Sequence, residues 1–311
     1  MNTLLRRPML WLTGRRWFRH LVTDLGVGRR VASRFVAGES LDDAMAATAR
    51  LRERGSSSML DHLGENVRSA SQVAEATDGY VRALKAVREH PDLDCTISVK
   101  LTQLGLVTSI DLCLESMERV LQAAASPDGS SLVMIDMEAS AFVDRTLEVY
   151  LALRERFPQT ALGMQANLRR TATDAERIGG RGSIVRMVKG ACLEPEEIAF
   201  QRRREVDANF ARVCATLLGM GSTVHFATHD PHLLEGARRF IRSRSISNTR
   251  YEFQFLYGIR RDLQEELVRE GEPVRVYVPY GSEWYPYLTR RLAERPANIW
   301  FFLSNLTRPR G

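Results

Sequence analysis

Several patterns that would assign a function class are missing from this 311-residue sequence. Its four cysteines, at positions 95, 113, 192 and 214, lack the paired spacing of a zinc site or a disulfide framework, so a reduced, cytoplasmic setting fits best. No apolar run approaches transmembrane length. No Gly-x-Gly-x-x-Gly fingerprint or P-loop follows the first expected strand, and no Gly-x-Ser-x-Gly elbow occurs. These absences disfavour nicotinamide-binding, P-loop and α/β-hydrolase enzymes.

The sequence also lacks a large excess of charge of one sign. The sequence has 44 basic and 38 acidic residues, a formal charge of +6, and the surplus is spread along the chain. Nucleic-acid binders usually gather such charge in one patch, so the surplus indicates an anionic substrate, cofactor or membrane surface instead. Residues 13–18 resemble a twin-arginine signal, but no apolar segment follows them, and we interpret them as part of a structural helix.

The chain divides into two expected parts. Residues 1–55 are arginine-rich and helical in pattern, and we expect this N-terminal helical segment to pack on a larger domain. Ser40, with Asp43 three residues later, predicts a helix start, and Gly55 predicts its end. Residues 56–311 form the expected catalytic domain.

From residue 56 onward, short apolar segments alternate with amphipathic helical stretches. The expected strands are Ser57–Leu60, Cys95–Lys100, Leu132–Asp136, Ala161–Gln165, Ile184–Lys189, Val224–Ala227, Tyr251–Phe255 and Val274–Val278. The helical stretches include Asp78–Glu89, Asp111–Ala124, Arg145–Phe157, Val206–Met220 and Arg260–Glu270. Eight strands, each followed by a helix, predict an α/β fold of the (β/α)₈ TIM-like barrel type.

Polar residues stand at or just beyond the ends of seven expected strands. They are Lys100, Asp136, Gln165, Arg186 to Gly190, His229, Gln254 and Tyr277. In a barrel these ends meet at one mouth, where active sites are built. The sequence therefore predicts one polar site at this mouth.

Each of these residues also has a purely structural interpretation. Lys100 either extends to solvent or offers a charge to an anion, and Asp136 either caps a loop or neutralises a cation. We expect Arg186 and Lys189 to lie on the same face of their strand, with Gly190 allowing close backbone approach. His229 is either a ligand donor or a turn residue bonded to backbone. No second histidine has metal-ligand spacing in the barrel half, so we predict no metal site.

The stretch from Val274 to Glu294 joins the last strand to the last helix. On that helix Tyr287, Arg290, Arg291 and Glu294 share one face. Beside it lies an apolar stripe that can dock the helix, formed by Trp284, Leu288 and Leu292. The planar guanidinium of arginine suits a carboxylate. The alternative is a solvated face with a weak Arg290–Glu294 pair.

Together these motifs resemble the proline dehydrogenases, specifically the short monofunctional bacterial type. The resemblance runs through most of the chain. Its motifs are RFVAGE (34–39), DHLGE (61–65), SVKLTQLG (98–105), MIDME (134–138), Gln165, VRMVKGACLEP (185–195), FATHD (226–230), YEFQFLYG (251–258) and the block at 277–295.

The resemblance implies a (β/α)₈ barrel that binds FAD without a covalent link, oxidises L-proline to Δ1-pyrroline-5-carboxylate and passes electrons to a membrane quinone. It implies a cytoplasmic enzyme, with peripheral contact at the inner face of the cell membrane left open, and no nucleic-acid partner. The implied substrate-binding residues are Lys100, Tyr277, Tyr287, Arg290, Arg291 and Glu294. The implied cofactor-binding residues are Met137, Gln165, Arg186, Val188, Lys189, Gly190, Thr228 and His229. Asp136 and Arg186 are the implied catalytic residues.

One position departs from the family pattern, because Cys192 stands where a tyrosine usually follows VKGA. Two interpretations of this replacement are open: it removes aromatic packing beside the cofactor, or it is neutral drift. Two other enzyme classes also remain: a flavin dehydrogenase of a related cyclic amino acid such as hydroxyproline, and a barrel aldolase that uses Lys100 or Lys189 as a Schiff base. A non-enzymatic binding or regulatory barrel is a further alternative. A visible flavin spectrum would separate the flavoenzymes from the aldolase and the binding module.

Overall fold

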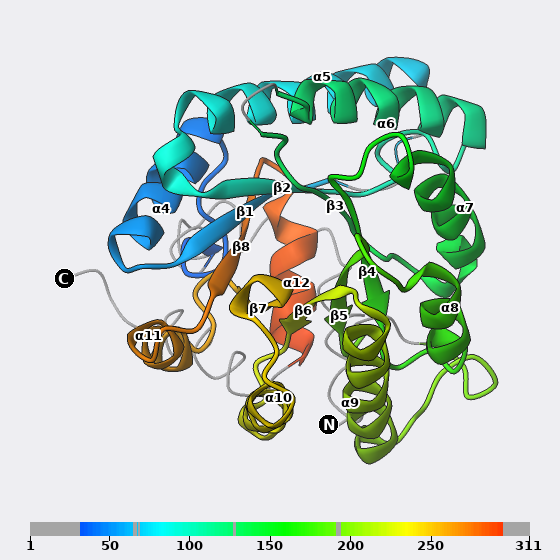
Figure 1. Cartoon of the computed structure of the whole chain (residues 1–311). Helices are drawn as coiled ribbons and strands as arrows, with labels where there is room; N and C mark the ends of the chain where they lie inside the picture. Colours follow the sequence, from blue (N-terminus) through cyan, green and yellow to red (C-terminus); the bar gives the residue numbers. More distant parts are fainter. Residues whose placement is uncertain (1–31, 65–66, 68, 127–128, 191–193, 295–311) are drawn as a thin grey trace.

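Eight parallel strands close into one barrel in the order β1 to β8 (Figure 1). The computed structural model describes residues 32–294 except 65–66, 68, 127–128 and 191–193, and it describes the side chains only as far as residue 289. The strands are β1 (Ser57–His62), β2 (Cys95–Val99), β3 (Val133–Ile135), β4 (Thr160–Gln165), β5 (Ile184–Val188), β6 (Thr223–Ala227), β7 (Tyr251–Leu256) and β8 (Val274–Tyr280). The predicted (β/α)₈ barrel is confirmed.

Helices surround this barrel (Figure 1). They are α4 (Leu41–Glu53), α5 (Ala70–Glu89), α6 (Ile110–Ala124), α7 (Val143–Arg154), α8 (Thr171–Ile178), α9 (Arg203–Met220), α10 (Pro231–Ser243), α11 (Arg261–Arg269) and α12 (Trp284–Glu294). Short 3₁₀ turns cover Pro91–Leu93, Ser140–Phe142 and Asn248–Arg250. Helix α5 begins at Ala70 rather than at the expected Asp78, because a capping box at Ser69 starts it two turns earlier. The predicted cap at Ser40 is confirmed, since its hydroxyl accepts from the Asp43 N–H at 3.1 Å.

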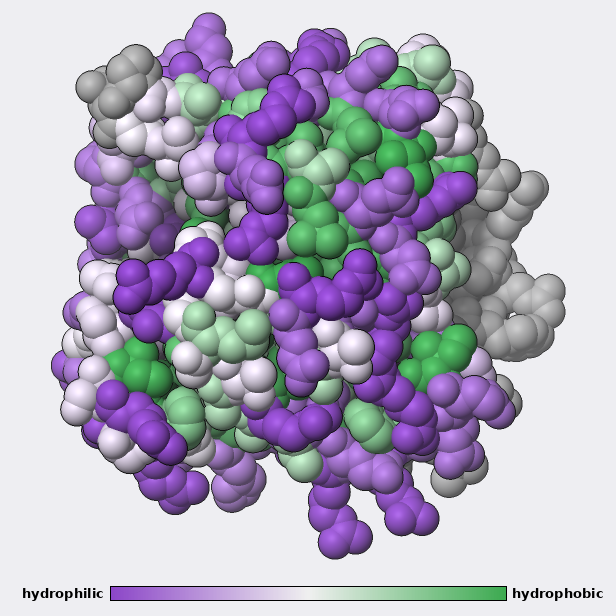
Figure 2. All heavy atoms as spheres, turned by 45° about the vertical axis from the view of Figure 1, so that its right-hand side comes forward, coloured by the Kyte–Doolittle hydropathy of each residue, from purple (hydrophilic) through white to green (hydrophobic). Residues whose placement is uncertain are grey.

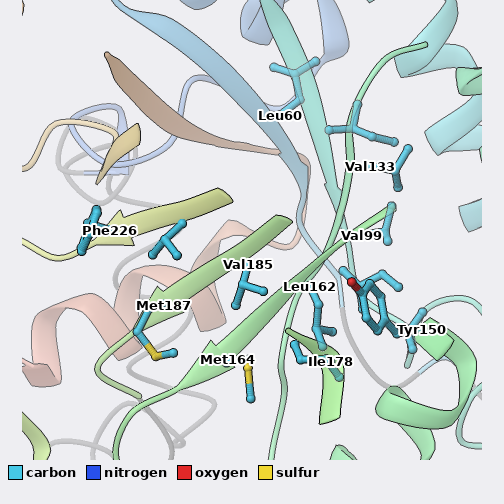
Figure 3. Packing of buried hydrophobic residues seen from close by; sticks show 14 of the residues in the cluster. Leu60, Val99, Val133, Tyr150, Leu162, Met164, Ile178, Val185, Met187 and Phe226 are labelled. Atoms are coloured by element: carbon cyan, nitrogen blue, oxygen red, sulfur yellow. The ribbon is translucent and has the colours of Figure 1, made fainter. Parts of the chain in front are cut away.

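The strands alternate between apolar and polar residues because their two faces meet different surroundings. Residues such as Leu60, Val99 and Leu162 point outward and pack under the helices, and Figure 3 shows Tyr150 near Val99 and Ile178 near Leu162. In a barrel, the intervening residues of each strand point inward. The main hydrophobic core is therefore the shell between the strands and the helices.

Much of the barrel interior is polar. The inward apolar cluster described is small and consists of Met59, Met134 and Ala161, with Leu132, Ile184 and Tyr277 at its edge. Buried charged residues such as Asp61, Lys100, Arg186 and Arg275 occupy other inward positions. Buried charges are costly without partners, so the interior must be organised by ion pairs and hydrogen bonds.

Helices α4 and α12 have different places relative to the barrel. Helix α4 packs against β8 and β1 on the outside. Helix α12 instead clusters with residues 32–36 and with Leu63, which follows β1, and in Figure 1 it crosses the centre of the ring of strands. The Trp284 indole also donates to Glu39 Oε1 at 3.2 Å. The chain before α4 and the last helix therefore pack together near the C-terminal end of β1.

The face of the molecule drawn in Figure 2 is mostly hydrophilic. The face in Figure 2 carries mainly polar and charged residues, with apolar residues gathered in patches between them. The large hydrophobic side chains exposed among the described residues are Val107, Ile198 and Met220. Within the described part of the chain, no helix combines the length and apolar character needed to span a bilayer. Residues 1–31 lie outside the described residues, so the division of the chain at residue 55 stays a prediction.

Candidate active site

Arg186 lies at the centre of a polar cluster inside the barrel. From β5 its guanidinium pairs with Asp136 beyond β3, lies 3.4 Å from the Met59 sulfur on β1, and stacks 5.4 Å from the centre of the Tyr277 ring on β8. Gly163 on β4 leaves this space open, because an added Cβ would lie 3.5 Å from Arg186 Nη2 and 3.2 Å from two backbone atoms. The cluster therefore joins strands from opposite sides of the barrel.

Asp136 is held by partners on every side. It pairs with Arg186, accepts from the Ser98 hydroxyl, accepts from Tyr277 at 2.7 Å and lies 3.8 Å from Lys100 Nζ. Burial by itself would raise the pKa of Asp136, but Arg186 and Lys100 hold that pKa below its usual value. Of its two sequence interpretations, neutralising a cation is the one the structure supports.

Lys100 does not extend to solvent. It is buried, and its ammonium pairs with Asp61 of β1. Burial opposes its charge, yet Asp61 and Asp136 raise the pKa of Lys100 above its usual value. A lysine kept charged in this way is a poor Schiff-base nucleophile, which argues against Lys100 as the reactive lysine of the aldolase alternative.

The expectation that Arg186 and Lys189 share a strand face is wrong. The two residues are three positions apart, and strand side chains alternate with a period of two. Arg186 points into the barrel, whereas Lys189 lies beyond the end of β5 and pairs with Asp230 at 2.8 Å and Asp207 at 2.5 Å. Lys189 therefore belongs to a separate ion cluster.

Gln165 connects the ends of β3 and β4. Its amide donates to the carbonyls of Met137, at 3.3 Å, and Glu138. Its Oε1 is buried and has no hydrogen-bond partner among the described residues, and the same holds for Arg186 Nε. Buried polar atoms are rarely left without partners, so these two indicate a ligand.

A tight backbone approach lies beside Gln165. Gly190 has a φ of +102°, and an added Cβ there would be only 1.9 Å from Asn167 Oδ1. Asn167 Oδ1 is another buried atom without a partner in the described part of the chain. Val188 accepts from the Ala166 N–H at 2.8 Å, which ties β5 to this segment. Gly190 is therefore required by both its conformation and its neighbour.

The predicted residues after β6 are organised by backbone contacts. His229 Nε2 accepts from the Leu256 N–H at 3.0 Å, and the Thr228 hydroxyl accepts from the Asp230 N–H at 3.2 Å. Asp230 caps α10, as expected, by accepting from the His232 N–H at 3.1 Å. Backbone therefore fixes the His229 ring through Nε2, on a loop next to the Lys189 cluster, and the predicted cofactor contact of His229 stays a prediction.

The last helix is only partly described. Trp284 and Leu288 are buried in the cluster that docks α12, so the docking stripe is confirmed for these two residues, and Tyr287, expected on the neighbouring polar face, is buried in the same cluster. The side chains of Arg290, Arg291 and Glu294 lie outside the described residues, as does Cys192. The predicted substrate contacts of Arg290, Arg291 and Glu294 therefore remain predictions.

Gln254 belongs to a second interior cluster rather than to the mouth. Its amide contacts His225 Nδ1 at 2.9 Å and Glu252 Oε1 at 2.8 Å. Glu252 pairs with Arg275 at 3.0 Å, and Arg275 also reaches Asp94 at 3.1 Å. Asp94 precedes β2 and Arg275 is the second residue of β8, so we call this group the floor cluster. The expectation that Gln254 joins the mouth is wrong, because its amide turns toward the N-terminal end of the barrel.

Several residues of the mouth were not predicted as site residues. They are Asp61, Met59, Ser98, Glu138 and Asn167. Asp61 carried a usable signal, since it is two residues from Met59 and therefore shares its inward face. No group of histidine, cysteine or acidic residues suited to a metal occurs within the described ranges.

Three comparisons relate this chain to known proteins. The family model described as proline dehydrogenase matches residues 44–302. Proline dehydrogenase 2 of Bacillus subtilis is 35% identical over 282 residues, which cover 90% of this chain and 92% of that protein. The proline dehydrogenase of Deinococcus radiodurans is 36% identical over 281 residues, covering 89% and 90% of the two chains.

A solved structure supports the fold. The crystal structure of proline utilization A from Bdellovibrio bacteriovorus, inactivated by N-propargylglycine, aligns with a TM-score of 0.77 at 23% identity. The alignment covers 86% of this chain but 32% of that longer protein. At this identity the match speaks for the barrel only, whereas the family match and the identities above 30% apply to nearly the whole chain. This chain belongs to the proline dehydrogenase family.

Proposed function

We propose that this enzyme uses FAD to oxidise L-proline to Δ1-pyrroline-5-carboxylate and passes the electrons to a membrane quinone. Proline oxidation follows from its family, and the family implies a flavin. The observation that carries the proposal is the pair of buried, unpartnered atoms, Gln165 Oε1 and Arg186 Nε, beside a charged cluster. An acceptor and a donor so placed fit the polar edge of an isoalloxazine ring, which offers both N–H and acceptor atoms.

A bound flavin supplies the two-electron acceptor that the polypeptide lacks. Arg186 and Gln165 would hold its ring, and Met137, Val188, Lys189, Gly190, Thr228 and His229 would hold the rest of the cofactor. Gly190 supports this assignment because its φ of +102° lets the chain turn after β5 against Asn167, whose buried Oδ1 has no hydrogen-bond partner among the described residues. The protein's own task is to place proline and balance charge.

The charge balance supports a place for the substrate carboxylate beside helix α12. In the described mouth, Lys100 and Arg186 are matched by Asp61 and Asp136, so no positive charge is left over there. A carboxylate buried at that point needs further cations. Arg290 and Arg291 supply them in this proposal, Glu294 pairs with one of these arginines, and Lys100 adds a third contact.

Tyr277 and Tyr287 complete the proposed substrate site. The Tyr277 hydroxyl is fixed by Asp136 and its ring by Arg186, so the ring presents a rigid wall. Burial and Asp136 raise the pKa of Tyr277 well above its usual value, which keeps it a neutral donor. Asp136 is therefore assigned to orienting Arg186, Lys100 and Tyr277 together.

The test is anaerobic bleaching of the flavin by L-proline and by pyrrolidine, which lacks the carboxylate. We expect Arg290→Lys and Arg291→Lys to lose about 2–5 kcal/mol in kcat/KM for proline, because an ammonium does not replace a planar two-pronged contact. Both variants should also lose most of the parent enzyme's preference for proline over pyrrolidine. Arg269→Lys on exposed α11 is the matched control and should behave as the parent. Parental preference in both variants would assign Arg290 and Arg291 to the solvated surface instead.

A further inference from the structure

Tyr80 reaches the ends of two barrel strands from outside the barrel. It belongs to α5 and is fully buried. Its hydroxyl accepts a hydrogen bond from the Lys100 N–H at 3.3 Å and donates one to Gln103 Oε1. Both functions of the hydroxyl are therefore used, and both partners belong to the turn that follows β2.

Gln103 extends this chain of hydrogen bonds to β1. Its amide donates to the His62 carbonyl at 3.2 Å. Gly64 makes room for it, since an added Cβ at that position would lie 2.6 Å from Gln103 Nε2. The Tyr80 ring also meets the His62 ring edge-on, with centroids 6.1 Å apart. Tyr80 and Gln103 thus link the backbone beside Asp61 to the backbone of Lys100.

The link matters because Asp61 and Lys100 form a buried ion pair at the mouth. Their residues are 39 positions apart in the sequence, and each stands at the end of its strand. The ion pair has good geometry only if the two strand ends keep their separation. Burial and the nearby Asp61 carboxylate raise the pKa of Tyr80 well above its usual value, so its hydroxyl keeps its proton.

We propose that Tyr80, acting through Gln103, is a positioning residue that sets where the Lys100 ammonium stands in the substrate site. It touches neither substrate nor cofactor in this assignment. The inference rests on the proposed function in one respect, namely that Lys100 faces the proline carboxylate. Loss of the Tyr80 hydroxyl should then weaken proline binding more than it slows the reaction of bound proline.

The experiment measures flavin reduction by rapid mixing over a range of L-proline concentrations, which separates the apparent Kd from the limiting rate. In Tyr80→Phe we expect the Kd to rise about tenfold, the effect of a buried N–H that loses its acceptor, and the limiting rate to fall less than the Kd rises. Gln103→Leu should raise the Kd similarly. Because both residues belong to the same chain of hydrogen bonds, their effects should not add. The Kd of the double variant should therefore be no higher than the higher Kd of the two single variants.

Tyr150→Phe is the matched control. Tyr150 is equally buried on α7, and its hydroxyl has no hydrogen-bond partner in the described residues, so its removal should leave the Kd unchanged. Flavin content and the unfolding midpoint are measured for every variant. A parental Kd in Tyr80→Phe and Gln103→Leu, with or without lower stability, would overturn the positioning role. A parent enzyme that proline does not reduce would instead contradict the proposed function.

Discussion

The mouth and the floor of the barrel are both buried ion clusters, but they differ in how completely their polar groups are used. In the floor, Arg275 donates to Glu252, Asp94 and the Ser58 carbonyl, at distances of 2.8 to 3.1 Å. In the mouth, Arg186 Nε and Gln165 Oε1 have no partner among the described residues. A saturated cluster can only stabilise the fold, whereas a cluster with unused buried groups is prepared for a ligand.

The two clusters also hold their carboxylates in different ways. Burial by itself would raise the pKa of Glu252, but Arg275 and His225 hold that pKa below its usual value. Asp136 is likewise kept ionised, but it is shared among Arg186, Lys100, Ser98 and Tyr277. Asp136 can therefore lose one partner and keep others, while Glu252 depends mainly on one arginine. The comparison yields three predictions.

The largest effect is expected in the floor. Arg275→Met leaves Glu252 and Asp94 without their cation, so the free energy of unfolding should fall by about 3–5 kcal/mol. Chemical denaturation measures it. The control is Arg119→Met, which breaks an exposed pair with Asp78, and should cost about 1 kcal/mol or less. A loss in Arg275→Met as small as in this control would remove the distinction between the floor and a surface ion pair.

The next effect separates the clusters by function. Arg186→Ala should slow flavin reduction by proline about 10²- to 10³-fold, because it removes a fixed charge from the proposed redox edge. Its free energy of unfolding should fall less than that of Arg275→Met, since Asp136 keeps Lys100, Ser98 and Tyr277. Rapid-mixing reduction and denaturation of both variants provide the comparison. Parental reduction rates in Arg186→Ala would show that the mouth does not contact the flavin there.

The smallest effect concerns pH. Burial, assisted by Arg275 and Arg186 and opposed by Glu252, lowers the pKa of His225 to about 4. The unfolded chain, with a histidine pKa near 6.5, binds more protons between these values. The free energy of unfolding should therefore fall as pH drops from 6.5 toward 4, with a slope from this residue of up to about 1.4 kcal/mol per pH unit.

His225→Gln should remove that slope. The mouth carboxylate Asp136 has a lowered pKa, so its contribution is present above its unfolded pKa of 3.8 and is lost only in stronger acid. Denaturation at pH 4.5, 5.5 and 6.5, in parent and His225→Gln, isolates the contribution of His225, because His62, whose pKa burial also lowers, is present in both proteins. Parallel stability profiles would mean that His225 is not buried in its neutral form.

The architecture could be predicted from local patterns. Residues such as Val274, Val276 and Val278 alternate with Arg275 and Tyr277, and this alternation reports two faces of a strand wherever that strand lies. The cap at Ser40 depends on a neighbour three residues away. Likewise, the convergence of Lys100, Asp136, Arg186 and Tyr277 follows from parallel strands ending at one rim.

The sequence did not predict which side chains pair with one another inside the barrel. The sequence left Lys100 either extending to solvent or offering its charge to an anion, and it did not indicate that barrel closure brings Asp61 beside it from the neighbouring strand. Gln254 was expected at the mouth and turned instead toward His225 and Glu252. Arg186 and Lys189 were expected on one face, although their spacing alone excludes this for a strand.

The sequence by itself determined the strands, the barrel class, the family motifs and most of the polar residues at the mouth, because each depends on short-range periodicity or composition. Only the tertiary structure decided which charges neutralise one another, which buried atoms stay unpartnered and that Tyr80 reaches Lys100 from α5. Arg275 and the Ser58 carbonyl are 217 positions apart, and Arg186 and Met59 are 127 apart. Contacts over such separations are set by barrel closure and side-chain packing, which no local pattern encodes.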